Sequence, residues 1–200
     1  PDADRVGIAM KCPDGSYELV SGNEMGVLLL DFICAGRIEK GTMPEKPVAV
    51  KSIVSTPLAD AVAEHYGVEL RSVLTGFKWI GDQIARLEDA GEVDRFIFGF
   101  EESYGCLVGT HARDKDAIVA TMALCEAAAY YKSKNMTLWD AMIEMYERYG
   151  YYRDDVKAIT MKGIEGLQKI KGIMETLRKD APQAIGDYKV LSARDYKEDT

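Results

Sequence analysis

The sequence is poor in cysteine, histidine and long apolar runs. Its four cysteines form no Cys-x-x-Cys pair and only two histidines accompany them, so a zinc site is not predicted. We expect free thiols in a reducing, cytoplasmic compartment, without a secretory signal. The longest apolar run, from Met25 to Leu30 and on past Asp31 to Ala35, is far short of a membrane span.

Positive charge is also in short supply. The chain has 25 Lys and Arg against 33 Asp and Glu, which gives a net charge of −8. Such a chain is poorly suited to holding nucleic acid or an anionic membrane by bulk charge, although a few local cations can still bind a small anion. What is present is ordinary globular composition, with 47% hydrophobic residues in 200.

Apolar segments that alternate with helical patterns fill the middle of the chain. Three segments are predicted as strands, namely 48–54, 68–74 and 93–100. Predicted helices run from an Asn23 N-cap to Ile38, from Thr56 to Gly67, after Lys78 to Gly91, and from Thr137 to Gly150. A further long helix has a predicted buried stripe of Ile118, Met122, Cys125 and Ala129. This alternation predicts an α/β layered domain over about residues 20–150.

The two flanks differ from this central part. At the start, 6–10 and 17–20 are predicted to form a hairpin, and the absence of an initiator Met suggests a chain that begins inside a longer one. At the end, a strand over 156–161, a helix with apolar residues from Ile164 to Leu177 and a strand over 188–191 are expected. This piece is short for an independent core and is interpreted as the beginning of another domain.

Ligands of layered α/β folds meet the loops at the carboxyl ends of the strands. Three loops have that position: Ser55–Thr56, Thr75–Lys78 and Glu101–Arg113. In the last, two adjacent carboxylates repel each other unless a donor meets them, and sugar hydroxyls are good donors. The alternative is a solvated turn.

Cations and acids elsewhere complete the candidate residues. His111, Arg113 and Lys115 precede a helix, whose start attracts anions, although local pairing with Asp114 and Asp116 is an equal alternative. Lys51 and Lys78 each sit at a strand–loop junction and, taken singly, are more often surface lysines. Asp2 and Asp4, beside Arg5, suit Mg²⁺ but need a third oxygen ligand, and solvated acids are the simpler interpretation of the pair alone.

Four motifs in order resemble the α-D-phosphohexomutase superfamily, on its phosphoglucomutase branch. Residues 1–5, Pro-Asp-Ala-Asp-Arg, are similar to the tail of that family's metal loop, Asp-x-Asp-x-Asp-Arg. Residues 98–105, Phe-Gly-Phe-Glu-Glu-Ser-Tyr-Gly, resemble its sugar-recognition loop. Thr-Gly-Phe-Lys at 75–78 and Arg-Asp-Lys-Asp at 113–116 match two further motifs, and the similarity in character extends to about Tyr152.

The resemblance implies a four-domain enzyme of which this chain holds a part. Residues 1–20 would end the metal-binding second domain, 21–153 would form the sugar-recognition third domain, and 154–200 would be a linker and the incomplete start of the fourth. The implied fold class is α/β, a three-layer α/β/α domain with a mixed sheet, plus partial flanking domains. The remaining mutase domains would be partners within the same full-length chain.

The resemblance also implies a role for each matching residue. Asp2 and Asp4 would be two of three Mg²⁺ ligands, and Arg5 would lie beside the phosphoserine. Glu101 and Ser103 would bind sugar hydroxyls. Five residues would hold phosphate or line the cleft: Lys51, Lys115, Thr75, Gly76 and Lys78. His111 and Arg113 would lie nearby with less specific support.

The implied reaction is reversible interconversion of glucose 1-phosphate and glucose 6-phosphate through a phosphoserine and a 1,6-bisphosphate, with glucose 1,6-bisphosphate as activator. The Thr-Ala-Ser-His-Asn-Pro loop and the Arg-x-Ser-Gly-Thr-Glu loop of the family are absent, so we expect no turnover from this polypeptide alone. A phosphomannomutase or phosphopentomutase of the same superfamily, a non-catalytic sugar-phosphate-binding module, and a purely structural interaction domain remain alternatives.

Overall fold

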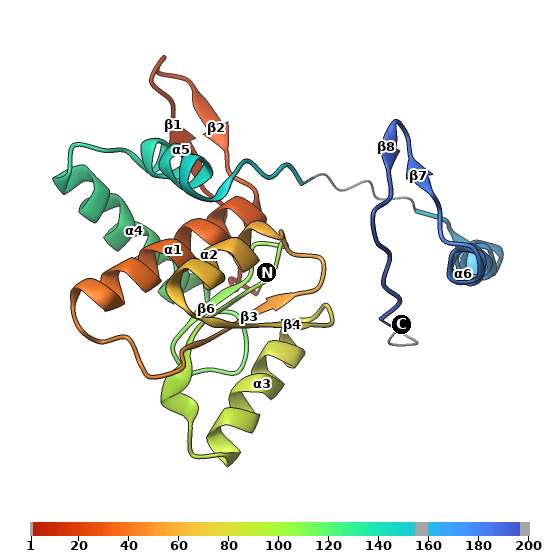
Figure 1. The fold of residues 1–200 in the computed structure, drawn as a ribbon, viewed down its shortest axis with the longest axis horizontal. Coiled ribbons are helices and arrows are strands. Elements are labelled where there is room, and N and C mark those ends of the chain that lie inside the picture. Colours follow the sequence, from red (N-terminus) through yellow and green to blue (C-terminus); the bar gives the residue numbers. More distant parts are fainter. Residues whose placement is uncertain (1, 155–159, 197–200) are drawn as a thin grey trace. The chain divides into compact units, whose positions relative to one another are not determined.

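The computed structural model describes residues 2–154 and 160–196. By its internal contacts the chain separates into two units, Pro1–Asp154 and Asp155–Thr200 (Figure 1). Within the described residues, no helix has both the length and the apolar character needed to cross a lipid bilayer. The predicted domain limits at residues 20 and 153 stay predictions.

A mixed four-stranded sheet, in the order β4-β3-β5-β6, forms the centre of the first unit. Its strands are β3 (Val48–Ser52), β4 (Glu69–Val73), β5 (Phe96–Phe100) and β6 (Cys106–Val108). The first three are parallel, whereas β6 runs antiparallel to β5. The carboxyl ends of β3, β4 and β5 therefore share one edge of the sheet, and β6 begins there.

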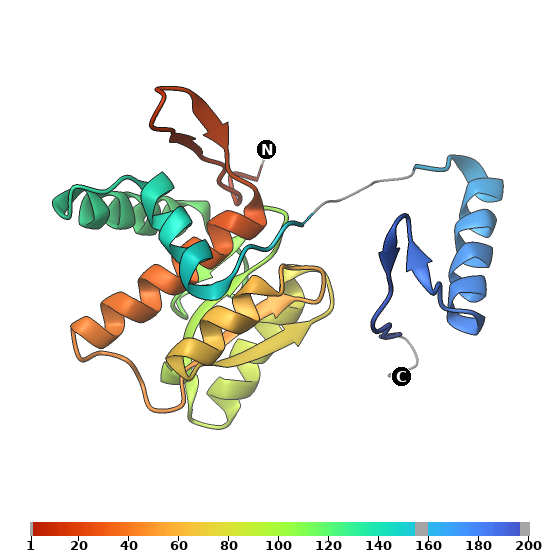
Figure 2. The same ribbon diagram turned by 45° about the horizontal axis from the view of Figure 1, so that its top comes forward.

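Helices cover both faces of this sheet (Figures 1 and 2). The larger core lies under α1 (Gly22–Glu39), α2 (Leu58–Tyr66), α4 (Ala117–Ser133) and α5 (Leu138–Tyr149). The smaller core packs α3 (Phe77–Asp89) against the other face, where Val48, Val50 and Phe96 meet Ile80 and Ile84. The predicted three-layer α/β/α domain with a mixed sheet is confirmed.

Local chemistry explains where the helices begin and end. The Ser21 side chain caps α1 by accepting from the Glu24 backbone N–H, and Glu24 returns a contact to Ser21, so the predicted Asn23 cap is wrong. Asn23 instead accepts from the backbone N–H of Thr56 at 3.0 Å. Thr137 and Asp140 form a capping box at the start of α5, where the sequence predicted that this helix begins.

Several predicted boundaries are corrected by the structure. The hairpin consists of β1 (Ala9–Lys11) and β2 (Tyr17–Leu19), β3 ends before Ile53, and a 3-10 turn, η1 (Val93–Arg95), precedes β5. The segment predicted as a loop over 101–113 contains β6, and α3 already begins within the predicted 75–78 loop. Short apolar stretches next to polar turns carried too little periodicity to locate these ends.

The predicted buried stripe of α4 is wrong. Ile118 and Met122 are 73% and 66% exposed, and Cys125 is exposed as well. The buried face consists of Ala120, Leu124, Ala127 and Tyr131. This helix is apolar on almost every side, so its sequence supports more than one stripe and only packing selects between them.

The second unit contains α6 (Gly163–Lys179) and a short hairpin of β7 (Ala184–Ile185) and β8 (Tyr188–Lys189). The predicted apolar face of α6 is exposed from Ile164 to Leu177. The strand predicted over 156–161 falls mostly outside the described residues.

Candidate functional site

Three loops meet at the carboxyl edge of the sheet. In the ladder, Lys51 of β3 pairs with Ser72 of β4 and with Phe100 of β5, so the residues that follow these strands emerge side by side. The predicted loops Ser55–Thr56 and Thr75–Lys78 and the turn of residues 101–105 are thereby brought together. The sequence predicted that the loops after these strands would meet at the carboxyl ends of the strands.

Glu101 links the loop after β5 to the loop after β4. Its side chain is buried, and Oε1 accepts from the backbone N–H of Gly76 at 2.7 Å. The Glu101 backbone N–H in turn donates to the Gly105 carbonyl at 2.9 Å and closes the turn. Among the hydrogen bonds of the described residues, this carboxylate takes part through Oε1.

Glu102 points to a different loop. Its Oε2 accepts from Ser52 Oγ at 2.7 Å, and Ser52 Oγ lies 2.8 Å from Ser55 Oγ. The two adjacent glutamates thus diverge, each toward its own donor. Their mutual repulsion, noted from the sequence, is relieved by protein groups rather than left to solvent.

The backbone after Glu102 adopts an uncommon conformation. Tyr104 has a φ of 70°, and its carbonyl accepts from the backbone N–H of Val6 at 3.3 Å. Ser103, which lies between Glu102 and Tyr104 in the sequence, is half-buried. The turn therefore holds the N-terminal segment, residues 2–6, against the candidate site.

Lys115 joins the same segment from another side. Its Nζ lies 2.9 Å from Asp4 Oδ2 and 3.0 Å from Asp114 Oδ1, while its aliphatic part crosses Gly105. The hydrogen bond from Lys115 holds the pKa of Asp4 below its ordinary value. Burial opposes the charge of Lys115, but its bonds to Asp4 and Asp114 outweigh burial and raise its pKa. Asp4, Lys115 and the Glu101 turn are therefore neighbours.

The remaining predicted cations are distributed differently. Lys51 is 5% exposed, and its Nζ donates to the Thr56 carbonyl at 3.1 Å and pairs with Asp60 of α2. Lys78 is exposed, with Nζ 5.0 Å from the ring centroid of Trp79. Lys51 is thus occupied within the protein, whereas Lys78 faces solvent beside the loop.

His111 and Arg113 have protein partners of their own. His111 Nε2 lies 3.0 Å from Asp116 Oδ2, and this hydrogen bond is the main reason that the pKa of Asp116 is lowered. Arg113 reaches Glu88 of α3 at 2.6 Å, so the alternative of local pairing with Asp114 or Asp116 does not hold for Arg113. For Lys115 that alternative does hold, because Lys115 pairs with Asp114. Arg113 is therefore tied to α3 rather than to the Glu101 turn.

The predicted magnesium ligands do not make a complete site by themselves. Asp2 and Arg5 are exposed, and the Asp4 carboxylate faces Lys115. Within residues 2–154 and 160–196, no group of three His, Cys, Asp or Glu side chains is arranged to hold a metal ion. Mg²⁺ prefers near-octahedral oxygen coordination, which two carboxylates do not supply alone.

Sequence reasoning missed Ser52 and Asn23. Ser52 is fully buried at the end of β3, where its hydroxyl meets Glu102, and Asn23 secures the Thr56 backbone from the start of α1. A serine at the end of a strand that is apolar except for Lys51 was the available signal for Ser52. Asn23 gave no comparable signal because its position equally suits a helix cap.

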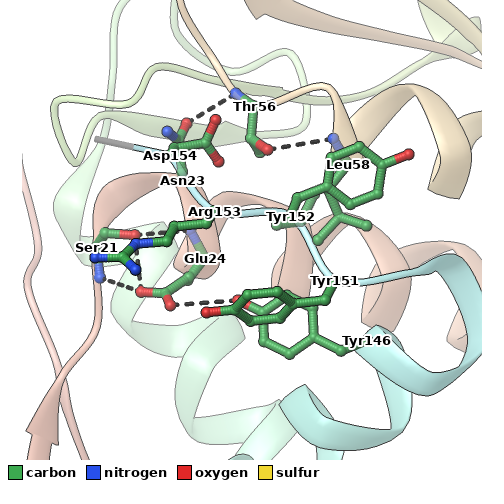
Figure 3. Close-up of a pocket in the computed structure, with 11 residues that line it drawn as sticks. Ser21, Asn23, Glu24, Thr56, Leu58, Tyr146, Tyr151, Tyr152, Arg153 and Asp154 are labelled. Carbon is green, nitrogen blue, oxygen red and sulfur yellow. Dashed lines mark hydrogen bonds between the residues drawn. The ribbon is translucent and has the colours of Figure 1, made fainter. Parts of the chain in front are cut away.

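A small polar pocket lies next to this edge, between the starts of α1 and α2 and residues 151–154 (Figure 3). In it, Tyr146 Oη donates to Glu24 Oε1 at 3.3 Å. Burial, with the nearby charge of Glu24, raises the pKa of Tyr146. Of the predicted loops, only Ser55–Thr56 reaches this pocket, through Thr56, and the candidate residues of the other two loops do not line it.

The fold and these loops define an α/β/α domain with acidic and basic side chains gathered at the carboxyl edge of its sheet. Residues 21–149 match the family model of phosphoglucomutase/phosphomannomutase, alpha/beta/alpha domain III. The chain therefore belongs to the phosphoglucomutase/phosphomannomutase family and carries its third domain, as the resemblance of the motifs predicted.

Individual relatives agree with this assignment. A phosphoglucomutase of Staphylococcus aureus (strain bovine RF122 / ET3-1) is 38% identical over 196 residues, which cover 98% of this chain but 34% of that protein. The chain thus spans about a third of the length of the curated relatives that it matches.

Solved structures show the same fold. The open form of pp63/parafusin, a phosphoglucomutase from Paramecium, is 25% identical with a TM-score of 0.55, covering 75% of this chain and 24% of that one. Aspergillus fumigatus N-acetylphosphoglucosamine mutase, 17% identical, is similar in fold alone, with a TM-score of 0.50 and coverages of 71% and 31%.

Proposed function

We propose that this chain supplies the sugar-recognition domain of a phosphoglucomutase. The complete enzyme would interconvert glucose 1-phosphate and glucose 6-phosphate through a phosphoserine and a 1,6-bisphosphate intermediate. The observation that carries the proposal is the Glu101 turn, whose buried carboxylate bridges two loops while Lys115 crosses the same turn. The four free thiols support a reducing, cytoplasmic location.

Glu101 and Ser103 are the proposed contacts to sugar hydroxyls. The Gly76 N–H fixes Oε1 of Glu101, and Oε2 is the proposed acceptor for a sugar hydroxyl. A hydroxyl donating to an ionised carboxylate makes a stronger hydrogen bond than one donating to a neutral acceptor. Thr75, Gly76 and Lys78 would line the adjoining side.

Lys115 is the best supported phosphate contact among the candidate cations. Its bonds to Asp4 and Asp114 raise its pKa, and its aliphatic part lies across Gly105 in the Glu101 turn. Lys51 would act more indirectly, because its ammonium already holds Thr56 and Asp60. His111 and Arg113 would support the loop that carries Lys115, through Asp116 and Glu88.

Asp2 and Asp4 would contribute two oxygen ligands to a magnesium ion, and Arg5 would face the phosphoserine supplied by another domain. Bound Mg²⁺ offsets negative charge on a transferring phosphoryl group. These two carboxylates are too few to hold the ion by themselves.

The test is turnover by the complete mutase with glucose 1-phosphate, mannose 1-phosphate and ribose 1-phosphate, each with its bisphosphate activator. Highest kcat/KM on glucose 1-phosphate supports the proposal. Preference for mannose or ribose phosphate would assign a different mutase of the same family. Absence of turnover with tight sugar-phosphate binding would favour a binding module. The 200-residue chain alone is expected to be inactive. Clear turnover by it would contradict the proposal that this chain supplies only part of the active site.

A further inference from the structure

The second glutamate of the turn is embedded in a buried hydrogen-bonded chain. Glu102 Oε2 accepts from Ser52 Oγ at 2.7 Å, and Ser52 Oγ is 2.8 Å from Ser55 Oγ. Ser52 and Ser55 are both buried, so their hydroxyls depend on protein partners. The chain fastens the turn after β5 to the loop after β3.

The backbone of the same residue is confined by the start of α1. A Cβ atom on Gly22, at the start of α1, would lie 2.0 Å from the Glu102 carbonyl oxygen and 2.7 Å from the Tyr104 backbone nitrogen. Only glycine permits this approach between the helix and the turn. The adjacent Asn23 also holds the loop after β3, through the Thr56 N–H at 3.0 Å.

Glu102 is therefore restrained at both its backbone and its side chain, and it stands directly between Glu101 and Ser103. With planar peptide bonds, each residue has only two soft backbone dihedrals. Restraining the middle residue thus restrains the directions in which both neighbours project.

We propose that Glu102 is a positioning residue, which sets the relative placement of Glu101 and Ser103 for sugar-hydroxyl recognition through its bond to Ser52. The inference rests on the proposed function for the role of Glu101 and Ser103. Glu102 itself does not touch the sugar. Its carboxylate matters as an acceptor for a hydroxyl rather than as a charge.

Variants of the complete mutase separate these roles. Glu102→Gln keeps a carbonyl oxygen that accepts from Ser52 and should retain kcat/KM within about threefold, whereas Glu102→Ala and Ser52→Ala should each lower it about tenfold. The double variant should be no worse than either single variant, since both remove the same bond. Discrimination between glucose 1-phosphate and mannose 1-phosphate should fall in parallel, which a loss of stability alone would not cause.

Matched controls lie on α4, away from this edge. Glu126→Ala removes an exposed partner of Lys40, and Ser133→Ala removes a hydroxyl bonded to the Tyr130 carbonyl. Neither should alter discrimination. If Glu102→Gln is as damaging as Glu102→Ala while Ser52→Ala is silent, Glu102 acts by its charge and the proposal is overturned. Normal discrimination in both alanine variants would overturn it as well.

A measurement on the 200-residue chain keeps this result distinct from the proposed function. Amide hydrogen exchange should show weaker protection of the Glu101 N–H, which donates to the Gly105 carbonyl, in Ser52→Ala than in Ser133→Ala. Unchanged protection would refute the restraint itself. If the complete mutase turns over none of the sugar phosphates, the proposed function is refuted. The hydrogen-exchange result would still show whether Ser52 restrains the Glu101 turn.

Discussion

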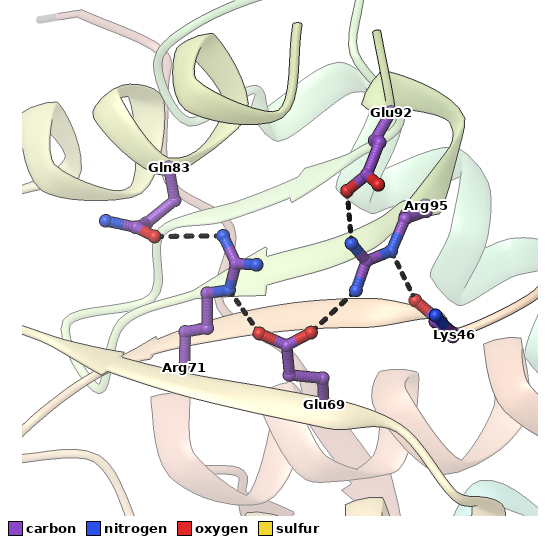
Figure 4. A network of polar contacts seen from close by, with 6 residues as sticks. All are labelled: Lys46, Glu69, Arg71, Gln83, Glu92 and Arg95. Atoms are coloured by element: carbon purple, nitrogen blue, oxygen red, sulfur yellow. Dashed lines mark hydrogen bonds and ion pairs between the residues drawn. The ribbon is translucent and has the colours of Figure 1, made fainter. Parts of the chain in front are cut away.

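The two edges of the central sheet carry similar residues in opposite arrangements. At the edge where the strands begin, the Glu69 carboxylate of β4 accepts from Arg71 Nε at 2.7 Å and from Arg95 Nη2 at 2.6 Å (Figure 4). Arg71 also donates to the side-chain oxygen of Gln83. At the edge where they end, Glu101 and Glu102 accept instead from a backbone N–H and a hydroxyl.

The difference lies in what neutralises the carboxylates. Two guanidinium groups match the charge of Glu69 and lower its pKa, chiefly through the hydrogen bond from Arg71. The donors to Glu101 and Glu102 are uncharged, so these carboxylates are oriented without being neutralised. One edge therefore carries an ionic network between charged side chains, and the other is the proposed site for a ligand with hydroxyl groups.

The strongest way to break this comparison is to remove one glutamate from each edge. Glu101→Ala should lower kcat/KM of the complete mutase by about 100-fold, the range expected for losing hydrogen bonds to a charged group. Glu69→Ala is the matched control and should leave turnover within about twofold. Steady-state kinetics on glucose 1-phosphate measures both. Comparable losses in the two variants would remove the functional distinction between the edges.

Packing at the ligand edge offers the next largest effect. Gly22→Ala places a methyl group against the Glu102 carbonyl and should destabilise the chain by about 2 kcal/mol, as overpacking does. Gly36→Ala in the same helix meets open space and should stabilise by up to about 1 kcal/mol. Urea denaturation compares the two. Equal effects would mean that α1 and the turn do not approach as closely as described.

A smaller effect is expected at the ionic edge. Glu69→Gln should cost about 0.5 kcal/mol near neutral pH, because the side chain is 47% exposed and solvent screens its pairs. Because the pKa of Glu69 is lower in the folded state than its ordinary value of 4.5, the ionised carboxylate stabilises the fold fully above pH 4.5. This stabilisation is lost as the pH falls through the folded-state pKa. Denaturation at pH 7 and pH 3 should therefore show a wider gap between wild type and variant at pH 7. A constant gap would contradict the assigned cause.

The smallest predicted change concerns Asp4. Replacing Lys115 by Gln removes its ammonium, so the pKa of Asp4 should rise toward 3.8. An NMR titration of the Asp4 carboxyl carbon measures this, with Lys132→Gln on α4 as the control. An unchanged Asp4 pKa in Lys115→Gln would show that the N-terminal segment, residues 2–6, does not contact Lys115 beside the Glu101 turn in solution.

Much of the fold followed from apolar periodicity. Buried parallel strands and capped helices leave strong local signals, so the α/β alternation and the three loops at the strand ends were predictable. The strand β6 was missed because Cys106–Val108 is too short for a periodic pattern. The α4 stripe was misassigned because that helix is apolar on several sides.

The sequence predicted which residues form the candidate site better than it predicted which residues contact one another. The motif around Glu101 identified the turn, and Lys115 was correctly associated with Asp114. Pairs between distant residues carry no local signal, which is why Arg113 with Glu88 and Ser52 with Glu102 were not foreseen. Contacts of this kind follow from how loops converge after folding.

The central claim is that Glu101 meets a sugar hydroxyl. Kinetics of the complete mutase, wild type and Glu101→Gln, on glucose 1-phosphate and on analogues that each lack one ring hydroxyl tests it most directly. The account predicts that one hydroxyl deletion and Glu101→Gln are non-additive, each removing the same interaction. Additive losses for every hydroxyl would contradict it.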